Sequence, residues 1–276
     1  MIGGGPFHLQ AGQWTDDTSM ALCLATSLLR CGGFDAQDQM NRYRRWYREG
    51  YLSSTGKCFD IGGTVRSAIH AFELTGQPYS GSSDPQSAGN GSIMRLAPIP
   101  MFYALEPLQA MHFAEESSRT THAAHAALDA CRYFAGLMVG ALNGQDKETI
   151  LAPNYSPISA QGPRRYCEEI KSIAEGSFKM KQPPEICGTG HVVRSLEAAL
   201  WALYESSTFE EGALLAVNLG NDADTTGAVY GQLAGALYGI DAMPNSWREK
   251  LAMKDLIEDT AQGLLQSASK HAEGQK

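Results

Sequence analysis

The sequence lacks the features that mark membrane, secreted and nucleic-acid-binding proteins. No stretch approaches the roughly 18 consecutive apolar residues of a membrane span, and its opening, MIGGGPFHLQAGQW, has neither the basic nor the apolar region of a signal peptide. The net charge is −8, with no run of like charge, which argues against nucleic acid as the main partner because phosphate binding needs a basic face. None of the six cysteines forms a CxxC pair. We therefore expect a cytoplasmic protein with reduced, mostly buried thiols.

Alternating polar and apolar runs, which predict β-strands, are also nearly absent. Helical periodicity runs through most of the chain instead, in segments joined by short loops that contain Gly or Pro. Hydrophobic residues make up 43% of the 276 residues, enough for a sizeable core. We expect one all-α domain spanning residues 1–276, with no internal repeat. The helical segments are 14–33, 35–50, 60–76, 107–122, 123–144, 163–176, 192–207, 208–220, 220–239 and 244–272.

An acidic cluster stands at the start of the small-residue, apolar helix predicted at 220–239. Asp222, Asp224, Thr225 and Thr226 lie within five residues. Asp and Thr are good N-cap residues, and negative charge suits a helix N-terminus. A cap needs only one such residue, however, and two carboxylates this close repel each other unless a cation lies between them. From this stretch alone, a helix cap and a metal site remain equally open.

A second cluster of the same composition lies near the start of the chain, at residues 15–18. Thr15, Asp16, Asp17 and Thr18 again precede an apolar helix. Hard oxygen ligands suit Mg²⁺, Mn²⁺ or Ca²⁺, whereas zinc prefers His and Cys, which neither cluster has at ligand spacing. The repeated pattern favours a metal site over two independent caps. Two divalent ions held there would activate a bridging water for attack.

The stretch 88–100 carries a different chemistry. Gly89 and Gly91 would let the backbone approach an anion closely, Ser92 adds a hydroxyl, and Arg95 could meet a phosphate or carboxylate. Asn-Gly is also an ordinary turn. His122, at a helix start, has a structural hydrogen-bonding role as its alternative.

Three stretches together closely resemble the ADP-ribosylglycohydrolase family, which includes dinitrogenase reductase-activating glycohydrolase and the ADP-ribosylarginine hydrolases. They are GQWTDDTSMALCLA, GNGSIMRLAPIP and NLGNDADTTGAVYGQLAGALYG. The resemblance continues in order through almost the whole chain, and the paired TDDT and DADT elements are its most specific part.

The resemblance implies a single-domain orthogonal helical bundle whose cleft holds two divalent metal ions, Mg²⁺ or Mn²⁺. It implies metal ligands from the two acidic elements, namely Thr15, Asp16, Asp17, Asp222, Asp224 and Thr225. It implies that the GNG loop, the Thr-His element and the acidic residue of the DIG element bind the substrate, through Gly89, Asn90, Gly91, Ser92, Arg95, His122 and Asp60.

The activity that the resemblance implies is hydrolysis at the distal ribose C1″, which removes ADP-ribose from a modified protein or small molecule. The expected linkage is N-glycosidic to arginine, with Asp60 as counter-charge to the guanidinium. Either Asp16 or Asp17 would act as the catalytic proton acceptor.

The chain departs from the family pattern at its start, since the usual helix with a GDALG-like element and a glutamate close to one metal is absent before Met1. The alternative function is therefore an ADP-ribose-binding protein with little or no turnover. We also expect one weaker metal position. An apolar strip left open along Ala21, Leu24 and Leu28, or along 234–237, would lead to a homodimer or to lowered stability.

Overall fold

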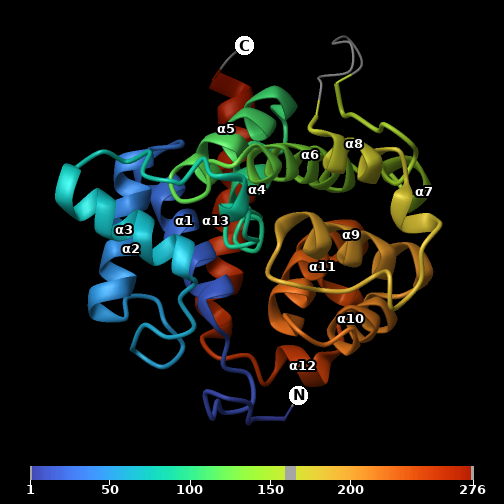
Figure 1. Cartoon of the computed structure of the whole chain (residues 1–276), viewed down its shortest axis with the longest axis horizontal. Coiled ribbons are helices and arrows are strands. Elements are labelled where there is room, and N and C mark those ends of the chain that lie inside the picture. Colours follow the sequence, from blue (N-terminus) through green and yellow to red (C-terminus); the bar gives the residue numbers. More distant parts are fainter. Residues whose placement is uncertain (1, 159–165, 275–276) are drawn as a thin grey trace.

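The fold is a bundle of helices at steep angles to one another (Figure 1), as predicted. The computed structural model describes residues 2–158 and 166–274, with only the backbone described for the last four. Within these ranges there are no β-strands, only isolated bridges. The α-helices are α1 (Asp16–Cys31), α2 (Ala36–Glu49), α3 (Gly63–Thr75), α4 (Pro98–Phe102), α5 (Pro107–Arg119), α6 (His125–Leu142), α7 (Lys147–Ile150), α8 (Glu168–Ala174), α9 (Val192–Glu205), α10 (Phe209–Asn218), α11 (Ala223–Tyr238), α12 (Asn245–Arg248) and α13 (Lys254–Gly274).

Helix boundaries follow local sequence signals. α1 ends at Gly32, whose φ of 68° is the left-handed conformation that glycine adopts without steric cost. α2 begins after Asp35, whose carboxylate accepts from the Asp38 N–H at 2.9 Å. α10 begins after Thr208, whose hydroxyl accepts from the Glu211 N–H at 3.2 Å. Asp and Thr are residue types that commonly cap helix N-termini in this way.

Two apolar cores flank α1. The smaller core joins α1, α2 and α3 around Met20, Tyr43 and Trp46. The larger core includes Leu24 and Leu28 of α1 and continues through α4, α5, α6, α9 and α11. In Figure 1, α1–α3 form the left side of the molecule and α9–α11 the right. α1 thus packs against both apolar cores, and its N-terminus lies between the two sides of the molecule.

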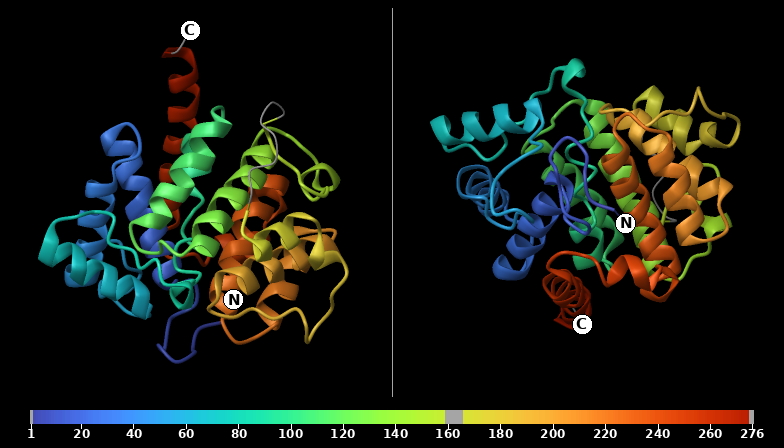
Figure 2. Two further views of the ribbon diagram at one scale, coloured as in Figure 1. Left: turned by 45° about the horizontal axis from the view of Figure 1, so that its top comes forward. Right: turned by 90° about the horizontal axis from the view of Figure 1, so that it is seen from below.

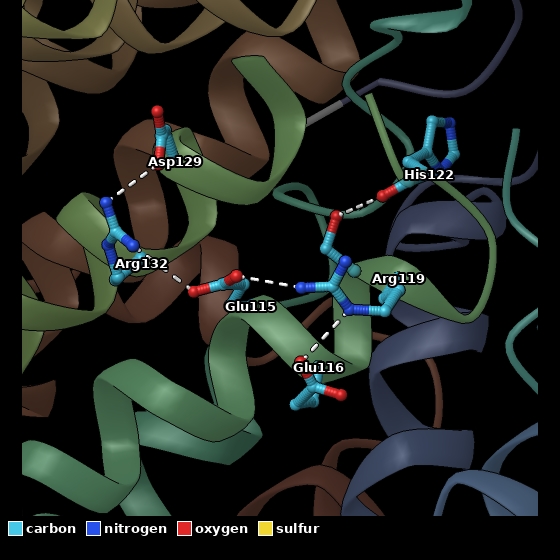
Figure 3. Close-up of polar contacts among 7 residues, drawn as sticks. Glu115, Glu116, Arg119, His122, Asp129 and Arg132 are labelled. Carbon is cyan, nitrogen blue, oxygen red and sulfur yellow. Dashed lines mark hydrogen bonds and ion pairs between the residues drawn. The ribbon is translucent and has the colours of Figure 1, made fainter. Parts of the chain in front are cut away.

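A chain of ion pairs crosses from α5 to α6 through the pair of Glu115 with Arg132. The Glu115 carboxylate accepts from Arg119 at 2.8 Å and from Arg132 at 3.3 Å, and Arg132 also donates to Asp129 at 2.8 Å. Figure 3 shows this chain of charges, with the His122 ring turned away from it. Because His122 lies on the short link between these two helices, the pairs fix the link that carries it.

Two predicted segments differ from the structure. The segment 244–272 is broken into α12 and α13, with Met253 between them at a φ of 52°. The segment 163–176 begins outside the described residues, and its described helical part is α8.

The predicted open apolar strip is wrong at Leu24, Leu28 and Ala234, which are fully buried because α4 and α13 pack against α1 and because α11 packs between its neighbours. Ala21 and residues 235–237 are half-buried. The homodimer stays a prediction. The prediction of mostly buried thiols is also wrong, since only Cys23 and Cys131 are buried and Cys31 is exposed. No helix in the described ranges has both the length and the apolar character needed to cross a membrane.

Candidate functional site

The two acidic clusters meet in one cleft, although the chain separates them widely. The Thr15 hydroxyl lies 2.8 Å from Asp17 Oδ2 and 3.1 Å from Asp224 Oδ2, a residue 209 positions away. The cleft has a volume of about 710 Å³. Its walls are the N-terminal ends of α1, α3 and α11, the 89–91 loop and the residues before α1. The cleft contains five of the predicted ligand residues, namely Thr15, Asp16, Asp222, Asp224 and Thr225.

Neither cluster acts as a side-chain helix cap. Thr15 is the N-cap residue of α1 and Asp222 that of α11, yet neither side chain accepts a capping hydrogen bond from a backbone N–H in the first turn of its helix. Thr15 turns toward Asp17 and Asp224, and Asp222 accepts from the Asn90 amide. The two residues best placed to cap are thus directed toward the cleft, which disfavours the reading of two independent caps.

The α1 carboxylates are buried against one another. Asp16 is 7% and Asp17 5% exposed. Burial, followed by repulsion from Asp17, Asp60 and Asp224, raises the pKa of Asp16 to about 9. Burial and then Asp224 raise the pKa of Asp17 to about 7. Charged carboxylates in this position are costly unless a cation compensates them.

Asp222 and Asp60 complete the acidic wall from the opposite side. Asn90 Nδ2 donates to Asp222 Oδ2 at 2.6 Å, which orients this carboxylate. Burial raises the pKa of Asp222 in spite of that bond. Asp60 lines the cleft with its backbone at a φ of 59°, and burial, then Asp224 and Asp222, raise its pKa to about 6. A non-glycine residue in this conformation carries strain that is typical of functional sites.

The donor set fits hard divalent cations. Carboxylate and hydroxyl oxygens surround the cleft, and the buried Oδ1 of Asp17 has no hydrogen-bond partner. Asp17 does not itself line the cleft, but it contacts Thr15, which does. Within the described part of the chain, no three Asp, Glu, His or Cys side chains stand in a ready ligand cluster. Binding would therefore require the carboxylates to turn toward the ion.

The 89–91 loop lies against His122. A Cβ atom at Gly91 would lie 2.9 Å from His122 Cε1, and one at Gly89 3.3 Å from Nε2, so the ring requires glycine at position 91 and leaves little room at 89. Burial, together with Arg95, lowers the pKa of His122 to about 3, which keeps the imidazole neutral. Its Nδ1 lies 2.9 Å from Thr121 Oγ1. His122 therefore presents a neutral ring to the cleft that it helps to line.

Two predicted substrate-binding residues lie beneath the loop and do not line the cleft. Arg95 is fully buried, where it donates to the Gly91 carbonyl at 2.7 Å and to Thr121 Oγ1 at 2.8 Å, and its guanidinium stacks on Tyr43. Ser92 is buried and accepts from Ser118 at 2.8 Å. The predicted direct anion contact of Arg95 therefore needs correction, because its donors are directed to the protein itself.

Sequence reasoning missed one wall of the cleft. The turn formed by residues 4–9 supplies Gly4, Gly5, Pro6, Phe7 and Leu9 to the lining. Its signal was the run Gly3-Gly4-Gly5-Pro6, which predicts a turn and not a helix. Asn221, at a φ of 53°, is a further lining residue that the acidic motif did not reveal.

The chain belongs to the ADP-ribosylglycohydrolase family, whose model matches residues 1–274. It is 44% identical to the ADP-ribosylarginine hydrolase Tri1 of Pseudomonas putida (strain GB-1), over 97% of this chain and 70% of that protein. It is 31% identical to the ADP-ribosyl-[dinitrogen reductase] glycohydrolase of Rhodospirillum rubrum, over 93% and 81%. A solved structure described as an ADP-ribosylglycohydrolase-related protein complex matches with a TM-score of 0.84 and 44% identity, over 97% of this chain and 86% of that one.

Proposed function

We propose that this protein is a metal-dependent hydrolase that releases ADP-ribose from ADP-ribosylated arginine by cleaving the N-glycosidic bond at C1″. The observation that carries the proposal is the hydrogen bond between Thr15 and Asp224, which joins the two acidic helix N-termini in one cleft. Two of the relatives above are named ADP-ribosylarginine hydrolase and ADP-ribosyl-[dinitrogen reductase] glycohydrolase. These names support an ADP-ribosylated protein as the class of substrate.

The proposed ion-binding residues are Thr15, Asp16, Asp17, Asp222, Asp224 and Thr225. When bound there, two divalent ions, Mg²⁺ or Mn²⁺, would lower the pKa of a water and orient the ribose hydroxyls. The side-chain amide of Asn90 donates to Asp222 and so orients this proposed ion-binding carboxylate. The unpartnered Oδ1 of Asp17 is the atom that gains most from a cation.

Asp16 is the better proton acceptor of the two α1 carboxylates because it lines the cleft, whereas Asp17 does not. Positive charge that develops at C1″ as the bond breaks is stabilised by the surrounding carboxylates. Asp60 faces the scissile end and offers a counter-charge to the guanidinium of the acceptor.

Buried residues of the protein hold the 89–91 loop in place. Arg95 anchors the loop from below, and the neutral His122 ring packs against its glycines. A substrate phosphate or ribose then meets a preformed backbone surface, together with one imidazole edge.

Turnover of an ADP-ribosyl-arginine peptide tests the proposal. In H₂¹⁸O, we expect free ADP-ribose carrying the label at C1″ and an unmodified, unlabelled arginine peptide, both detected by mass spectrometry. EDTA should abolish release, and Mg²⁺ or Mn²⁺ should restore it. The binding of ADP-ribose is measured by calorimetry in parallel with the turnover assay. Binding without release, with metal present, would reject hydrolysis in favour of the ADP-ribose-binding alternative.

A further inference from the structure

The 4–9 turn forms one wall of the cleft. Gly4 and Leu9 exchange backbone hydrogen bonds of 2.8 and 3.0 Å, which close the turn. The residues that follow attach it to the body, where Gln13 donates to the Ser54 carbonyl at 3.2 Å and Trp14 Nε1 to the Ala252 carbonyl at 3.1 Å. The right-hand view of Figure 2, seen from below, shows this segment crossing the centre of the picture, and Figure 1 shows it at the lower edge of the molecule. The chain is thus attached to the body just after the turn, and within the turn the Phe7 ring contacts Phe59.

The turn presents an aromatic ring to a cleft that also contains Asp16, Asp60, Asp222 and Asp224. The rings of Phe7 and Phe59 lie 5.3 Å apart, tilted by 58°. Phe7 is 40% exposed and lines the cleft, and neither ring belongs to the two apolar cores. Core packing therefore does not account for the pair. Phe59 directly precedes Asp60 in the chain, and Phe7 and Asp60 both line the cleft.

A cleft that carries both one exposed aromatic ring, Phe7, and the Asp60 carboxylate suits a guanidinium. This group is planar, weakly hydrated and always charged, so it pairs with a carboxylate and stacks on an aromatic face. A neutral hydroxyl acceptor would gain from neither contact. The ADP-ribose part of the substrate, by contrast, carries negative phosphates that gain nothing from Asp60.

We propose that the 4–9 turn and Asp60 form the binding site for the acceptor arginine, with Phe7 as the residue that stacks on its guanidinium. This rests on the proposed function and adds a specificity-determining residue to it. Phe59 supports the Phe7 ring, and the turn's backbone faces the chain that carries the modified arginine.

Phe7→Leu tests the site, because leucine keeps an apolar side chain and removes the π-face. We expect KM for ADP-ribosyl-arginine to rise about tenfold, in the range that a desolvated cation–π contact supplies. The inhibition constant of free ADP-ribose, which has no guanidinium, should stay within about twofold. Phe7→Tyr should retain the wild-type KM. Tyr79→Leu, an exposed aromatic outside the cleft, is the matched control.

Coupling between Phe7 and Asp60 sharpens the test. If both contact one guanidinium, Phe7→Leu combined with Asp60→Asn will deviate from the product of the two single effects. An unchanged KM in Phe7→Leu overturns the proposal. An inhibition constant of ADP-ribose that rises by the same factor as KM also overturns the proposal, because the Phe7 ring would then contact the nucleotide.

A second readout does not depend on turnover. Calorimetric binding of ADP-ribosyl-arginine in EDTA should weaken in Phe7→Leu by the same factor as KM rises. A wild-type protein that binds this ligand but releases no ADP-ribose once Mg²⁺ is supplied would reject the proposed function, and the binding constants of the two proteins in EDTA would still decide the role of Phe7.

Discussion

The two acidic helix N-termini use the same residue types in opposite surroundings. Asp16 and Asp17 are buried at the start of α1, which lies between two apolar cores, whereas Asp222 is half-buried and Asp224 exposed at the start of α11. On the α11 side Asp222 is oriented by Asn90, while on the α1 side an oxygen of Asp17 has no partner. The comparison indicates that the carboxylates of α1 are fixed in a poorly solvated position, whereas the more exposed carboxylates of α11 can change their orientation.

Removing one carboxylate from each side should give the largest effect. Asp17→Asn and Asp224→Asn should each lower kcat/KM for ADP-ribosyl-arginine by about 10²- to 10³-fold, since both sides serve one centre. The double variant should lose little more than either single one. Asp241→Asn, an exposed carboxylate beyond the end of α11, is the control. Wild-type turnover by Asp224→Asn would remove α11 from the site.

Without metal, the stability of the protein should fall as pH rises. An unfolded Asp titrates near ~3.9, whereas the folded pKa of Asp17 is about 7 and that of Asp16 about 9. The native state thus binds more protons than the unfolded state between pH 4 and 9, so the free energy of unfolding decreases across that window. We expect Tm in EDTA to drop by several degrees between pH 5 and 8.5, given a shift of about 2 °C per kcal/mol for a chain of this size.

The α1 side should account for most of this dependence. Asp17→Asn should flatten the profile more than Asp222→Asn, because Asp17 is fully buried and Asp222 is less buried and bonded to Asn90. A Tm in EDTA that increases with pH in the wild type would contradict the repulsion between these carboxylates.

A smaller effect is expected from the residue that orients the α11 carboxylate. Asn90→Ala should weaken metal binding and lower kcat/KM by about tenfold, at the lower end of what loss of an outer-shell partner costs. Thermal stability should change little. Asn218→Ala, at the exposed end of α10, is the control. Equal metal affinity in Asn90→Ala and the wild type would mean that Asp222 is positioned without the amide.

The helices and the pairing of the two acidic clusters could be predicted because each rests on local pattern or on a repeated motif. Periodicity gives the helical segments, and Thr-Asp-Asp-Thr with Asp-Ala-Asp-Thr marks two helix starts with surplus charge. What brings Thr15 to Asp224 is packing across the bundle, which no local pattern contains.

The errors came from contacts between distant segments. A sequence shows that Arg95 is charged but not that carbonyls and Tyr43 surround it, so a buried Arg looks like a ligand-binding one. The strip at Leu24 and Leu28 was predicted to be open because the family's first helix is absent, and the sequence did not show that α4 and α13, far along the chain, cover these residues. The 4–9 turn was missed as a wall because glycine and proline indicate a turn without indicating what it faces.

The orientation of α1 and α11 has an electrostatic consequence. Both helices direct their N-terminal ends into the cleft, and each such end carries about half a positive charge from aligned peptide dipoles. Backbone hydrogen bonds from the first turn of α1 already lower the pKa values of Asp16 and Asp17 against the stronger effect of burial. Part of the counter-charge for the four aspartates is therefore built into the main chain, where no side-chain substitution removes it. This positive potential from the peptide dipoles offsets part of the repulsion among the aspartates at the two helix N-termini before a cation binds.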